Sequence, residues 1–309
     1  MILDHHFVRP PHTNPFDNNN WISYNIYPGL YYAHRDTEYT KDTYSFAMQF
    51  HDYYELNIID SGSISFLCEG RMCIPRHGDI VFIPPYKLHE SILISERTRY
   101  IRYKFYFYPS ALSAFGCDAL LTQMIQRCGD DYFFTLEKEK KEQLFAVLNR
   151  LDDALALEKN ELNDCLVLSH ILQVFHLLSG MNACGDTGSY EKTAANEYLP
   201  QKLLDIQHYI DAHITEITAV SQIAEHFYYS REYLSRTFRK YLNMTVEEYL
   251  MKTRISRCLQ LMQEGQSITQ SCFSAGFGSI SNFYRTFRSQ TGLSPAEYCA
   301  AMKDHWKRS

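Results

Sequence analysis

Two arginines stand at equivalent places in a duplicated stretch of this sequence. Shifting the chain by 49 residues brings Arg236 onto Arg285, inside an Arg-Thr-Phe-Arg run that both copies share. The other identities at this offset include Ser230 with Ser279 and Glu248-Tyr249 with Glu297-Tyr298. A guanidinium group can donate two hydrogen bonds to O6 and N7 of one guanine. The repeated arginines therefore predict contacts in the major groove of DNA; the alternative is a solvated basic face, or arginines paired with Glu232 or Glu264.

Each copy carries the signals of a helix-turn-helix that would position its arginine. In the first copy, a short helix over residues 219–227 precedes Ser230, which caps a second helix to about residue 241. In the second copy, a helix over residues 268–275 precedes Ser279, which caps a helix to about residue 290. A capping serine accepts a hydrogen bond from a free backbone N–H group and so sets where the second helix begins.

The helical period decides which side chains of these second helices face outward. The expected inward residues are Tyr233, Leu234, Phe238 and Tyr241 in the first copy, and Phe283 and Phe287 in the second. In the first copy the outward positions are then Glu232, Ser235, Arg236 and Arg239. In the second they are Ile280, Ser281, either Asn282 or Tyr284, and Arg285. Arg236 and Arg285 lie where base edges come within reach, whereas Arg239, Lys240 and Arg288 lie further along and suit phosphate contacts.

One long helix is expected between the two copies, over residues 245–263. Its apolar side is formed by Val246, Tyr249, Leu250, Ile255, Leu259 and Met262. A stiff connecting helix fixes the distance between the two recognition helices, which must enter successive major grooves roughly 34 Å apart. The predicted footprint is therefore close to two helical turns of DNA for each chain.

The first part of the chain has a different pattern. Over residues 20–108, aromatic and β-branched runs such as residues 45–50 and Ile80-Val81-Phe82-Ile83 are separated by turn signals. These signals are Ser61-Gly62, Glu69-Gly70 and His77-Gly78-Asp79. Short strands with such punctuation predict an antiparallel barrel or jelly roll.

From residue 136 the apolar period becomes helical and predicts a helical hairpin. One run contains Leu144, Val147, Leu148, Leu151 and Leu155, and the next contains Leu162, Leu166, Ile171, Val174, Phe175 and Leu178. The hairpin either packs against the barrel or forms a dimer interface. Together with the repeat, this predicts an α+β fold: a sensing and dimerisation domain over residues 1–182, with its barrel at 20–108 and its helices at 110–180, a linker at 183–200, and an all-α domain at 201–309.

Composition and charge agree with this division. The chain has 309 residues, of which 45% are hydrophobic and 21% charged, and its net charge is -6. Residues 201–309 hold 13 Lys and Arg against 10 Asp and Glu, or +3, which leaves 17 against 26, or -9, for residues 1–200. A basic module tethered to an acidic one is typical of DNA binding combined with a second task. With no apolar stretch of about 18 residues and no signal-peptide core, we expect a cytoplasmic protein whose nine cysteines are reduced.

Residues 203–302 resemble the DNA-binding domain of the AraC/XylS family of bacterial regulators. The resemblance rests on Ile223-Ala224, the run 230–239, Arg254-Ile255, Ile268, Gly276-Phe277, the run 281–288 and Gly292-Leu293-Ser294-Pro295-Ala296-Glu297-Tyr298. It implies base contacts from Glu232, Ser235, Arg236, Ile280, Ser281, Asn282 and Arg285. Phosphate contacts would come from Ser230, Arg231, Arg239, Lys240, Ser279 and Arg288. The chain departs from the family at Ser271-Cys272, where the family has an aliphatic residue and Ala. It also departs at Cys258, where the family has Ala, and at Asn243, where it has Gly.

Residues 20–108 resemble the cupin-like sensor domain of many such regulators. The resemblance rests on His51-Asp52-Tyr53-Tyr54-Glu55-Leu56, Gly62, Gly78-Asp79, Pro84 and His89. It implies that His51, Glu55 and His89 meet in the barrel mouth, where they could ligate a metal ion, hydrogen-bond a polar ligand or serve structure alone. A metal-dependent cupin has a second His where this chain has Gln49 and favours Gly at the position of Tyr86. We therefore expect no metal or other cofactor, and ligand contacts from His51, Tyr53, Glu55, Tyr86 and His89; Tyr53, Tyr54 and Tyr86 would suit the pocket of a sugar.

These observations predict a ligand-responsive, DNA-binding transcriptional regulator and not an enzyme. The resemblance implies an activator of a carbohydrate-utilisation operon that binds promoter DNA and a sugar effector, contacts RNA polymerase and forms a homodimer. Two alternatives remain. A metal-dependent cupin enzyme would carry stoichiometric metal through His51, and a ligand-independent dimeric regulator would show no saturable response to sugars.

Overall fold

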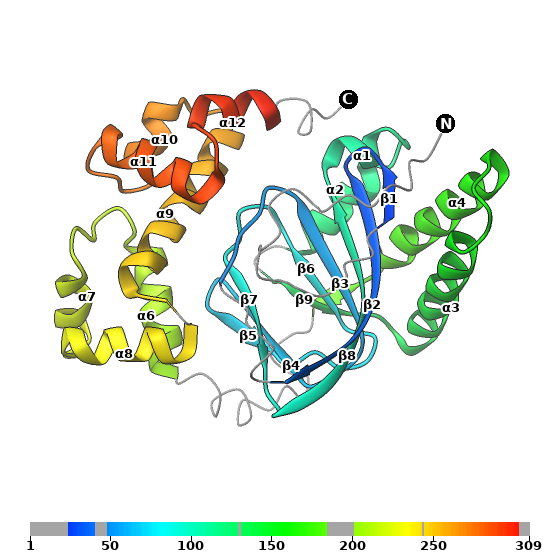
Figure 1. Ribbon diagram of the computed structural model, residues 1–309, viewed down its shortest axis with the longest axis horizontal. Coiled ribbons are helices and arrows are strands. Elements are labelled where there is room, and N and C mark those ends of the chain that lie inside the picture. Colours follow the sequence, from blue (N-terminus) through cyan, green and yellow to red (C-terminus); the bar gives the residue numbers. More distant parts are fainter. Residues whose placement is uncertain (1–23, 41–47, 129–130, 184–200, 243, 303–309) are drawn as a thin grey trace.

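All strands that the structure describes lie between residues 24 and 183 and pair in antiparallel fashion. The computed structural model describes residues 24–40, 48–128, 131–183, 201–242 and 244–302. Its strands are β1 (Tyr24–Tyr27), β2 (Leu30–Thr40), β3 (Tyr54–Ser61), β4 (Ile64–Cys68), β5 (Arg71–Cys73), β6 (Ile80–Ile83), β7 (His89–Leu93), β8 (Arg97–Phe107), β9 (Phe133–Thr135) and β10 (Asn182–Ala183). We call residues 24–183 the N-terminal part and residues 201–302 the C-terminal part (Figure 1).

These strands form two sheets. The larger has the order β1-β2-β8-β3-β6-β9-β10 and the smaller the order β5-β4-β7. The predicted antiparallel fold is confirmed, but the strands that the structure describes do not close into a barrel. The sheet also continues past residue 108, because β9 pairs with β6 and buries Phe134 completely. The predicted strand at 45–50 falls partly outside the described residues, and Gln49 makes only an isolated bridge to His89.

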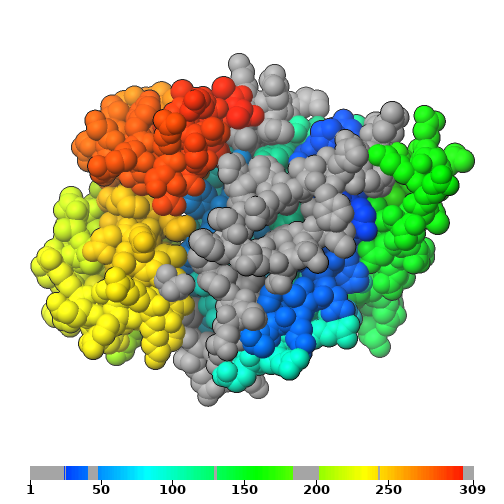
Figure 2. Space-filling view, in the orientation of Figure 1, coloured from blue at the N-terminus to red at the C-terminus, as the bar shows by residue number. Residues whose placement is uncertain are grey.

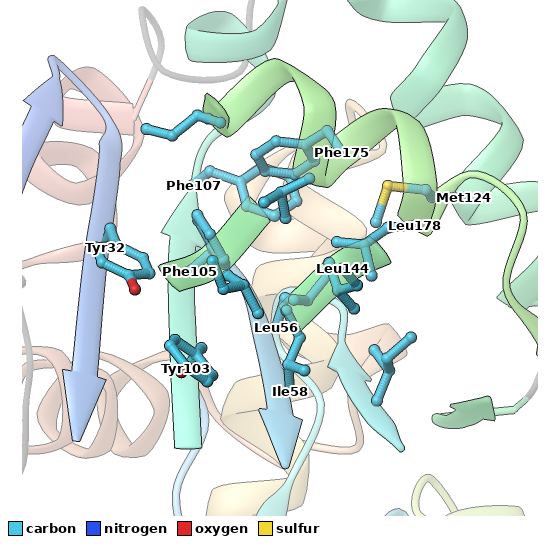
Figure 3. Close-up of a cluster of buried hydrophobic side chains, with 14 of the residues drawn as sticks. Tyr32, Leu56, Ile58, Tyr103, Phe105, Phe107, Met124, Leu144, Phe175 and Leu178 are labelled. Atoms are coloured by element: carbon cyan, nitrogen blue, oxygen red, sulfur yellow. The ribbon is translucent and has the colours of Figure 1, made fainter. Parts of the chain in front are cut away.

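Helices cover one face of the larger sheet. They are α1 (Pro109–Ser113), α2 (Asp118–Cys128), α3 (Lys138–Leu155) and α4 (Glu161–Leu178). Alternate residues of β3 and β8, such as Leu56 and Phe105, point toward these helices and meet Leu144 and Phe175 (Figure 3). Burying each such side chain contributes about 1.5–3 kcal/mol. This packing anchors β3 and β8, the two strands that carry Glu55, Asn57 and Lys104.

The predicted apolar face of α4 is wrong at its first turns. Val167, Ile171 and Val174 are fully buried, but Leu162 is 82% exposed and Leu166 40% exposed. The buried residues repeat at spacings of three and four from Asp164, so the two leucines lie on a different stripe of the helix. Together with Leu157, which is 50% exposed, they leave an apolar patch at the turn of the helical hairpin.

The C-terminal part is entirely helical in the residues described. Its helices are α6 (Gln201–Ala212), α7 (Val220–His226), α8 (Arg231–Leu242), α9 (Val246–Gln263), α10 (Ile268–Ser274), α11 (Ile280–Thr291) and α12 (Pro295–Met302). We call α7 with α8 the first unit and α10 with α11 the second unit. The long helix α9 joins them as predicted and begins at a reciprocal cap, in which Thr245 and Glu248 bond each other's backbone N–H groups.

The two parts pack against each other (Figure 2). Leu67 and Leu88 share a buried apolar cluster with Leu203 and Ile206 of α6. Tyr86 lies in a second cluster, which is the core of the second unit. Most of the linker expected at 183–200 lies outside the described residues, and its first residue belongs to β10. No helix among the described residues has the length and apolar character needed to cross a membrane.

Candidate functional site

Helix α8 presents the first set of expected DNA contacts. The Tyr233 N–H group donates a 3.1 Å hydrogen bond to Ser230 Oγ, which caps the helix where the sequence predicts. Arg231, Glu232 and Arg236 are exposed. Ser235 is half-buried at the wall of a cleft of about 650 Å³ that lies between α8 and the start of α9. The same cleft is lined by Arg254 and by Ser221 and Glu247, and the sequence did not single out the last two.

Helix α11 presents the second set at the equivalent place. The Asn282 N–H group donates to Ser279 Oγ at 3.3 Å, and Ile280, Ser281 and Arg285 are exposed. Arg285 also donates from Nη2 to Asn282 Oδ1 at 2.9 Å, on the same face of the helix. The residues expected at phosphates are all exposed, namely Ser230, Arg231, Arg239, Lys240, Ser279 and Arg288.

The alternative in which the arginines serve ion pairs does not fit. Within the part of the chain that the structure describes, no ion pair joins Arg236 to Glu232 or Arg285 to Glu264. The Glu232 carboxylate instead bonds its own backbone and Ser230, which lowers its pKa. Both guanidinium groups therefore remain able to contact an external partner.

The inward faces of the two units differ from expectation in detail. Tyr233 and Tyr241 are only half-buried, and Thr237 takes a buried position by donating from Oγ1 to the Tyr233 carbonyl at 2.8 Å. In the second unit Phe283 and Phe287 are fully buried as predicted. Ser271, one of the departures from the family, is also fully buried, and its hydroxyl has no hydrogen-bond partner among the described residues. The position of Asn243, another departure, lies outside the described residues.

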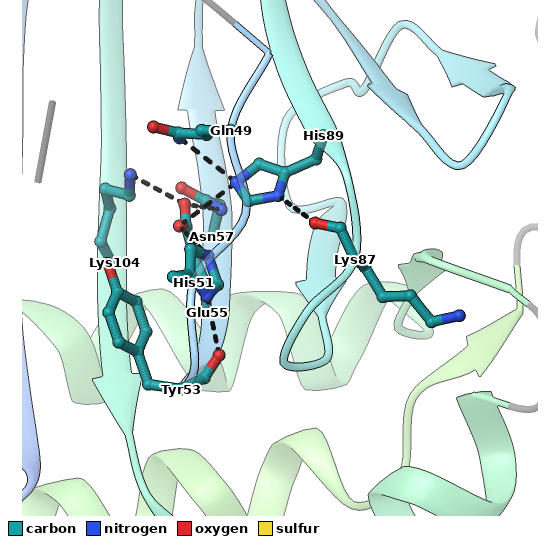
Figure 4. Close-up of polar contacts among 8 residues, drawn as sticks. All are labelled: Gln49, His51, Tyr53, Glu55, Asn57, Lys87, His89 and Lys104. Atoms are coloured by element: carbon teal, nitrogen blue, oxygen red, sulfur yellow. Dashed lines mark hydrogen bonds and ion pairs between the residues drawn. The ribbon is translucent and has the colours of Figure 1, made fainter. Parts of the chain in front are cut away.

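The N-terminal part brings His51, Glu55 and His89 together in a buried polar cluster (Figure 4). Glu55 Oε2 lies 3.0 Å from His51 Nε2 and 3.8 Å from His89 Nε2. Glu55 Oε1 accepts from Asn57 Nδ2 at 2.9 Å and pairs with Lys104 Nζ at 2.8 Å. We call these five residues, with Gln49 at 3.2 Å from His89 Nε2, the polar cluster. Neither Lys104 nor Asn57 was expected from the sequence.

Backbone carbonyl groups fix how the two histidines are protonated. His51 Nδ1 faces the Tyr53 carbonyl and His89 Nδ1 the Lys87 carbonyl, both at 2.8 Å. Because a carbonyl only accepts, each Nδ1 carries a proton and each Nε2 turns toward Glu55. Burial and the neighbouring His51 lower the pKa of His89 to about 4, so His89 is neutral at pH 7.

Charge compensation decides between the roles open to this cluster. Burial alone would raise the pKa of the Glu55 carboxyl, but the Lys104 ammonium group and the hydrogen bond from His51 hold it well below its ordinary value. Burial lowers the pKa of Lys104 to about 8, so both partners are charged at pH 7. The ligand atoms of His51, Glu55 and His89 lie within 4.8 Å of one another and could hold a metal ion. Since the Lys104 ammonium group already balances the charge of the Glu55 carboxylate, the arrangement favours hydrogen bonding over metal binding.

Three tyrosines expected at a sugar pocket have separate surroundings. Tyr53 stacks on His51 with ring centroids 4.0 Å apart, beside the polar cluster. Tyr54 belongs to the apolar core under the helices, stacked on Phe82 and Phe107, so it is wrong as a pocket residue. Tyr86 points into the C-terminal part and not toward Glu55. Tyr54 and Glu55 are neighbours in β3, and successive side chains of a strand point to opposite faces of the sheet. Tyr54 therefore lies in the apolar core while Glu55 lies in the polar cluster.

Comparisons with known proteins match both parts of the chain. Residues 35–175 match the family described as AraC-like ligand binding domain, and residues 223–301 match one described as helix-turn-helix domain. The chain belongs to the AraC family of transcriptional regulators. The matched families and the relatives named below indicate a transcriptional regulator and favour it over the enzyme alternative.

Two curated relatives of this AraC-family chain each match about a third of it. The transcriptional regulator ArgR of Pseudomonas aeruginosa is 37% identical over 28% of this chain and 27% of its own length. The melibiose operon regulatory protein of Escherichia coli is 30% identical over 34% of this chain and 33% of its own. The solved structure of ToxT from Vibrio cholerae covers 86% of this chain and 97% of that one, with 17% identity and a TM-score of 0.32. The chain thus spans about a third or less of the two curated relatives.

A buried carboxyl group lies where the two parts of the AraC-family chain meet. Glu90 follows Leu88 and precedes Ile92 on the face of β7 that packs toward α6, and it is 5% exposed. One of its oxygens has no hydrogen-bond partner among the described residues. Burial raises the pKa of Glu90 from its ordinary 4.5 to about 8, so the group is neutral in the folded protein at pH 7.

Replacing this group is expected to change how stability depends on pH. Because unfolded Glu90 ionises near pH 4.5 and folded Glu90 only near pH 8, the free energy of unfolding falls as pH rises between these values. By pH 6.5 this loss amounts to about 2–3 kcal/mol. Glu90→Gln removes this pH-dependent loss. In urea unfolding, the free energy of unfolding of the variant should therefore rise relative to that of wild type between pH 4.5 and pH 6.5. A difference that does not change with pH would contradict the assignment.

Proposed function

We propose that this chain is a sequence-specific, ligand-responsive regulator that binds promoter DNA with two recognition helices, α8 and α11. The observation that carries the proposal is the repeated exposure of an arginine at the same turn of two serine-capped helices, Arg236 in α8 and Arg285 in α11. The expected base contacts also include Glu232, Ser235, Ile280, Ser281 and Asn282. The capped N-terminal turns of such helices are the parts that reach base edges.

DNA selection tests this proposal directly. The intact chain is incubated with random-sequence duplexes in the presence of excess nonspecific DNA, and bound duplexes are amplified and sequenced. We expect two conserved blocks whose centres lie about one helical turn apart, because α9 holds the two units on one chain. Enrichment of a single block, or of none, would argue against a two-helix reader.

The two units are expected to contribute unequally to this recognition. The first unit presents Glu232, Ser235 and Arg236, which can all make hydrogen bonds to bases. The second presents the apolar Ile280 at its first turn, 41% exposed, and Arg285 bonded to Asn282. Base substitutions in the block read by the first unit should therefore cost about 1–3 kcal/mol each, and those in the other block less. Equal losses in both blocks would contradict this asymmetry.

We further propose that the N-terminal part binds a small polar effector at the polar cluster, with His51, Tyr53, Glu55 and His89 as contacts. A sugar suits this site because paired donors and acceptors can bond hydroxyl groups while the Tyr53 ring covers C–H surfaces. The melibiose operon regulatory protein among the relatives supports a carbohydrate-utilisation operon as the target. The proposal includes activation of that operon through contact with RNA polymerase. Thermal unfolding in a sugar library should give one saturable shift that Glu55→Gln abolishes; a ligand-independent regulator gives none.

Dimer formation is proposed through the apolar patch of Leu157, in the turn after α3, and Leu162 and Leu166 of α4. These leucines are 50%, 82% and 40% exposed. The hairpin of α3 and α4 lies far from the C-terminal part (Figure 1). A second copy of the chain meeting the same patch would bury all six side chains and leave both recognition faces uncovered.

A further inference from the structure

Tyr86 has a backbone conformation that side chains rarely adopt. Its φ angle is +63°, in the left-handed region that favours glycine. Two hydrogen bonds hold it there. The Tyr86 N–H group donates to the His51 carbonyl at 2.7 Å, and the Tyr86 carbonyl accepts from the Ser256 hydroxyl of α9. Backbone strain of this kind persists only where the surroundings enforce it, and here one enforcing contact comes from each part of the chain.

The ring of Tyr86 completes the core of the second unit. Tyr86 is 4% exposed and lies in one buried cluster with Ile255, Leu259, Phe283, Phe287 and Tyr298. All the other fully buried members of that cluster come from the C-terminal part. An aromatic side chain of the N-terminal part thus fills space among α9, α11 and α12, which explains why a tyrosine stands where glycine would be unstrained.

A second contact joins the same two regions beside Tyr86. The Asp52 carboxylate is 2% exposed and accepts from two tyrosine hydroxyls on different parts of the chain. Tyr108, which directly follows β8, donates to Asp52 Oδ1 at 3.0 Å. Tyr298 of α12 donates to Asp52 Oδ2 at 3.1 Å. Asp52 lies between His51 and Tyr53, so it is continuous with the polar cluster.

These contacts connect the polar cluster to the second unit by a very short path. His51 bonds the Tyr86 backbone on one side and the Glu55 carboxylate on the other, and His89 follows Tyr86 by three residues. His51 therefore cannot change its backbone position without releasing one of the two bonds that hold Tyr86 in its strained state. Release would let φ return to the ordinary region and would withdraw the ring from the core of the second unit.

We propose that Tyr86 is a strained latch that docks the second helix-turn-helix unit on the N-terminal part and is released when the polar cluster rearranges. The trigger rests on the proposed effector site, whereas the latch itself does not. In the docked state the N-terminal part fixes the orientation of α11 through α9 and α12. After release the second unit moves relative to the N-terminal part, which shifts the population of arrangements that can bind DNA.

Hydrogen exchange of the intact chain tests the latch. Tyr86→Gly removes the ring and relieves the strain, and it should raise amide exchange in α12 and in α9 around Ser256 at least about tenfold. Tyr86→Phe keeps the ring and the strain and loses only the hydrogen bond between the Tyr86 and Tyr298 side chains, so its increase should stay below about threefold. Tyr86→Gly with wild-type exchange, or Tyr86→Phe with the same increase as Tyr86→Gly, would overturn the latch.

Two further measurements separate docking from folding and the latch from its trigger. The helical circular dichroism of Tyr86→Gly should equal that of wild type while its radius of gyration by X-ray scattering increases; a loss of helical signal would instead make the ring part of the second unit's own fold. His51→Ala removes the side chain that bonds Glu55 but keeps the carbonyl group that accepts from Tyr86, so it acts on the latch only by rearranging the polar cluster. It should raise exchange in α12 as Tyr86→Gly does. If it does not, coupling to the cluster is refuted, while DNA selection still decides separately on the proposed function.

Discussion

Replacing Lys104 with methionine is expected to lower the free energy of unfolding by about 3–5 kcal/mol at pH 7.5. Lys104 Nζ lies 2.8 Å from Glu55 Oε1, and the two side chains are only 10% and 4% exposed. Methionine keeps most of the length and the apolar stem of lysine, so packing is largely preserved. The loss comes from the Glu55 carboxylate, which stays buried without the ammonium group that balances it. Urea unfolding of the intact chain measures the change.

The pH dependence of the Lys104→Met variant should reverse in sign. In wild type the pKa of Glu55 lies well below its ordinary value, so its stabilising contribution is present above about pH 4.5 and is lost as pH falls. Without Lys104, burial raises that pKa, and stability then decreases as pH rises. The double variant Glu55→Gln with Lys104→Met is the matched control and should recover at least about 2 kcal/mol. If it is no more stable than the single variant, the pair does not compensate charge as described.

Removing both repeated arginines is expected to weaken binding to the selected DNA by about 30-fold or more. One bidentate arginine–guanine contact contributes about 1–3 kcal/mol of discrimination, so two contribute at least about 2 kcal/mol. Arg236 and Arg285 are exposed on equivalent turns of α8 and α11, where neither is paired with a carboxylate among the described residues. Fluorescence anisotropy with Arg236→Ala, Arg285→Ala and the double variant measures the losses separately.

A matched control distinguishes base reading from general attraction to phosphate. Arg257 is also exposed, but it lies on α9 and bonds Gln260 at 3.2 Å, so Arg257→Ala removes one positive charge and no expected base contact. It should weaken binding equally on the selected and on a scrambled duplex. The double variant should lose affinity mainly for the selected duplex. Unchanged specificity in the double variant would exclude these arginines as base readers.

Much of the C-terminal part could be predicted because its signals are local. The caps at Ser230 and Ser279, and the one at Thr245, act on N–H groups only three residues away. The apolar period of α11 places Phe283 and Phe287 inward and Arg285 outward without reference to any other element. The 49-residue repeat then supplies the same information twice, which is why the helix boundaries were predicted to within one or two residues.

The polar cluster was predicted only in part, because its partners are distant in sequence. The resemblance to the cupin-like sensor domain implied that His51, Glu55 and His89 meet. Lys104 reaches Glu55 only through the pairing of β8 with β3, which sets Lys104 opposite Asn57. A lysine in the aromatic strand of residues 103–107 was the available signal, since a charged side chain there needs a buried partner.

The positions of the duplicated arginines on the outward faces of α8 and α11 could be predicted from the sequence alone, because helix caps and apolar spacing act within a few residues. The tertiary structure decided which surfaces meet. It exposed Leu162 although its spacing suggested burial, and it turned Tyr86 away from the pocket expected for it and into the core of the second unit. Such outcomes depend on which faces pack together across more than a hundred residues, and no local pattern encodes that choice.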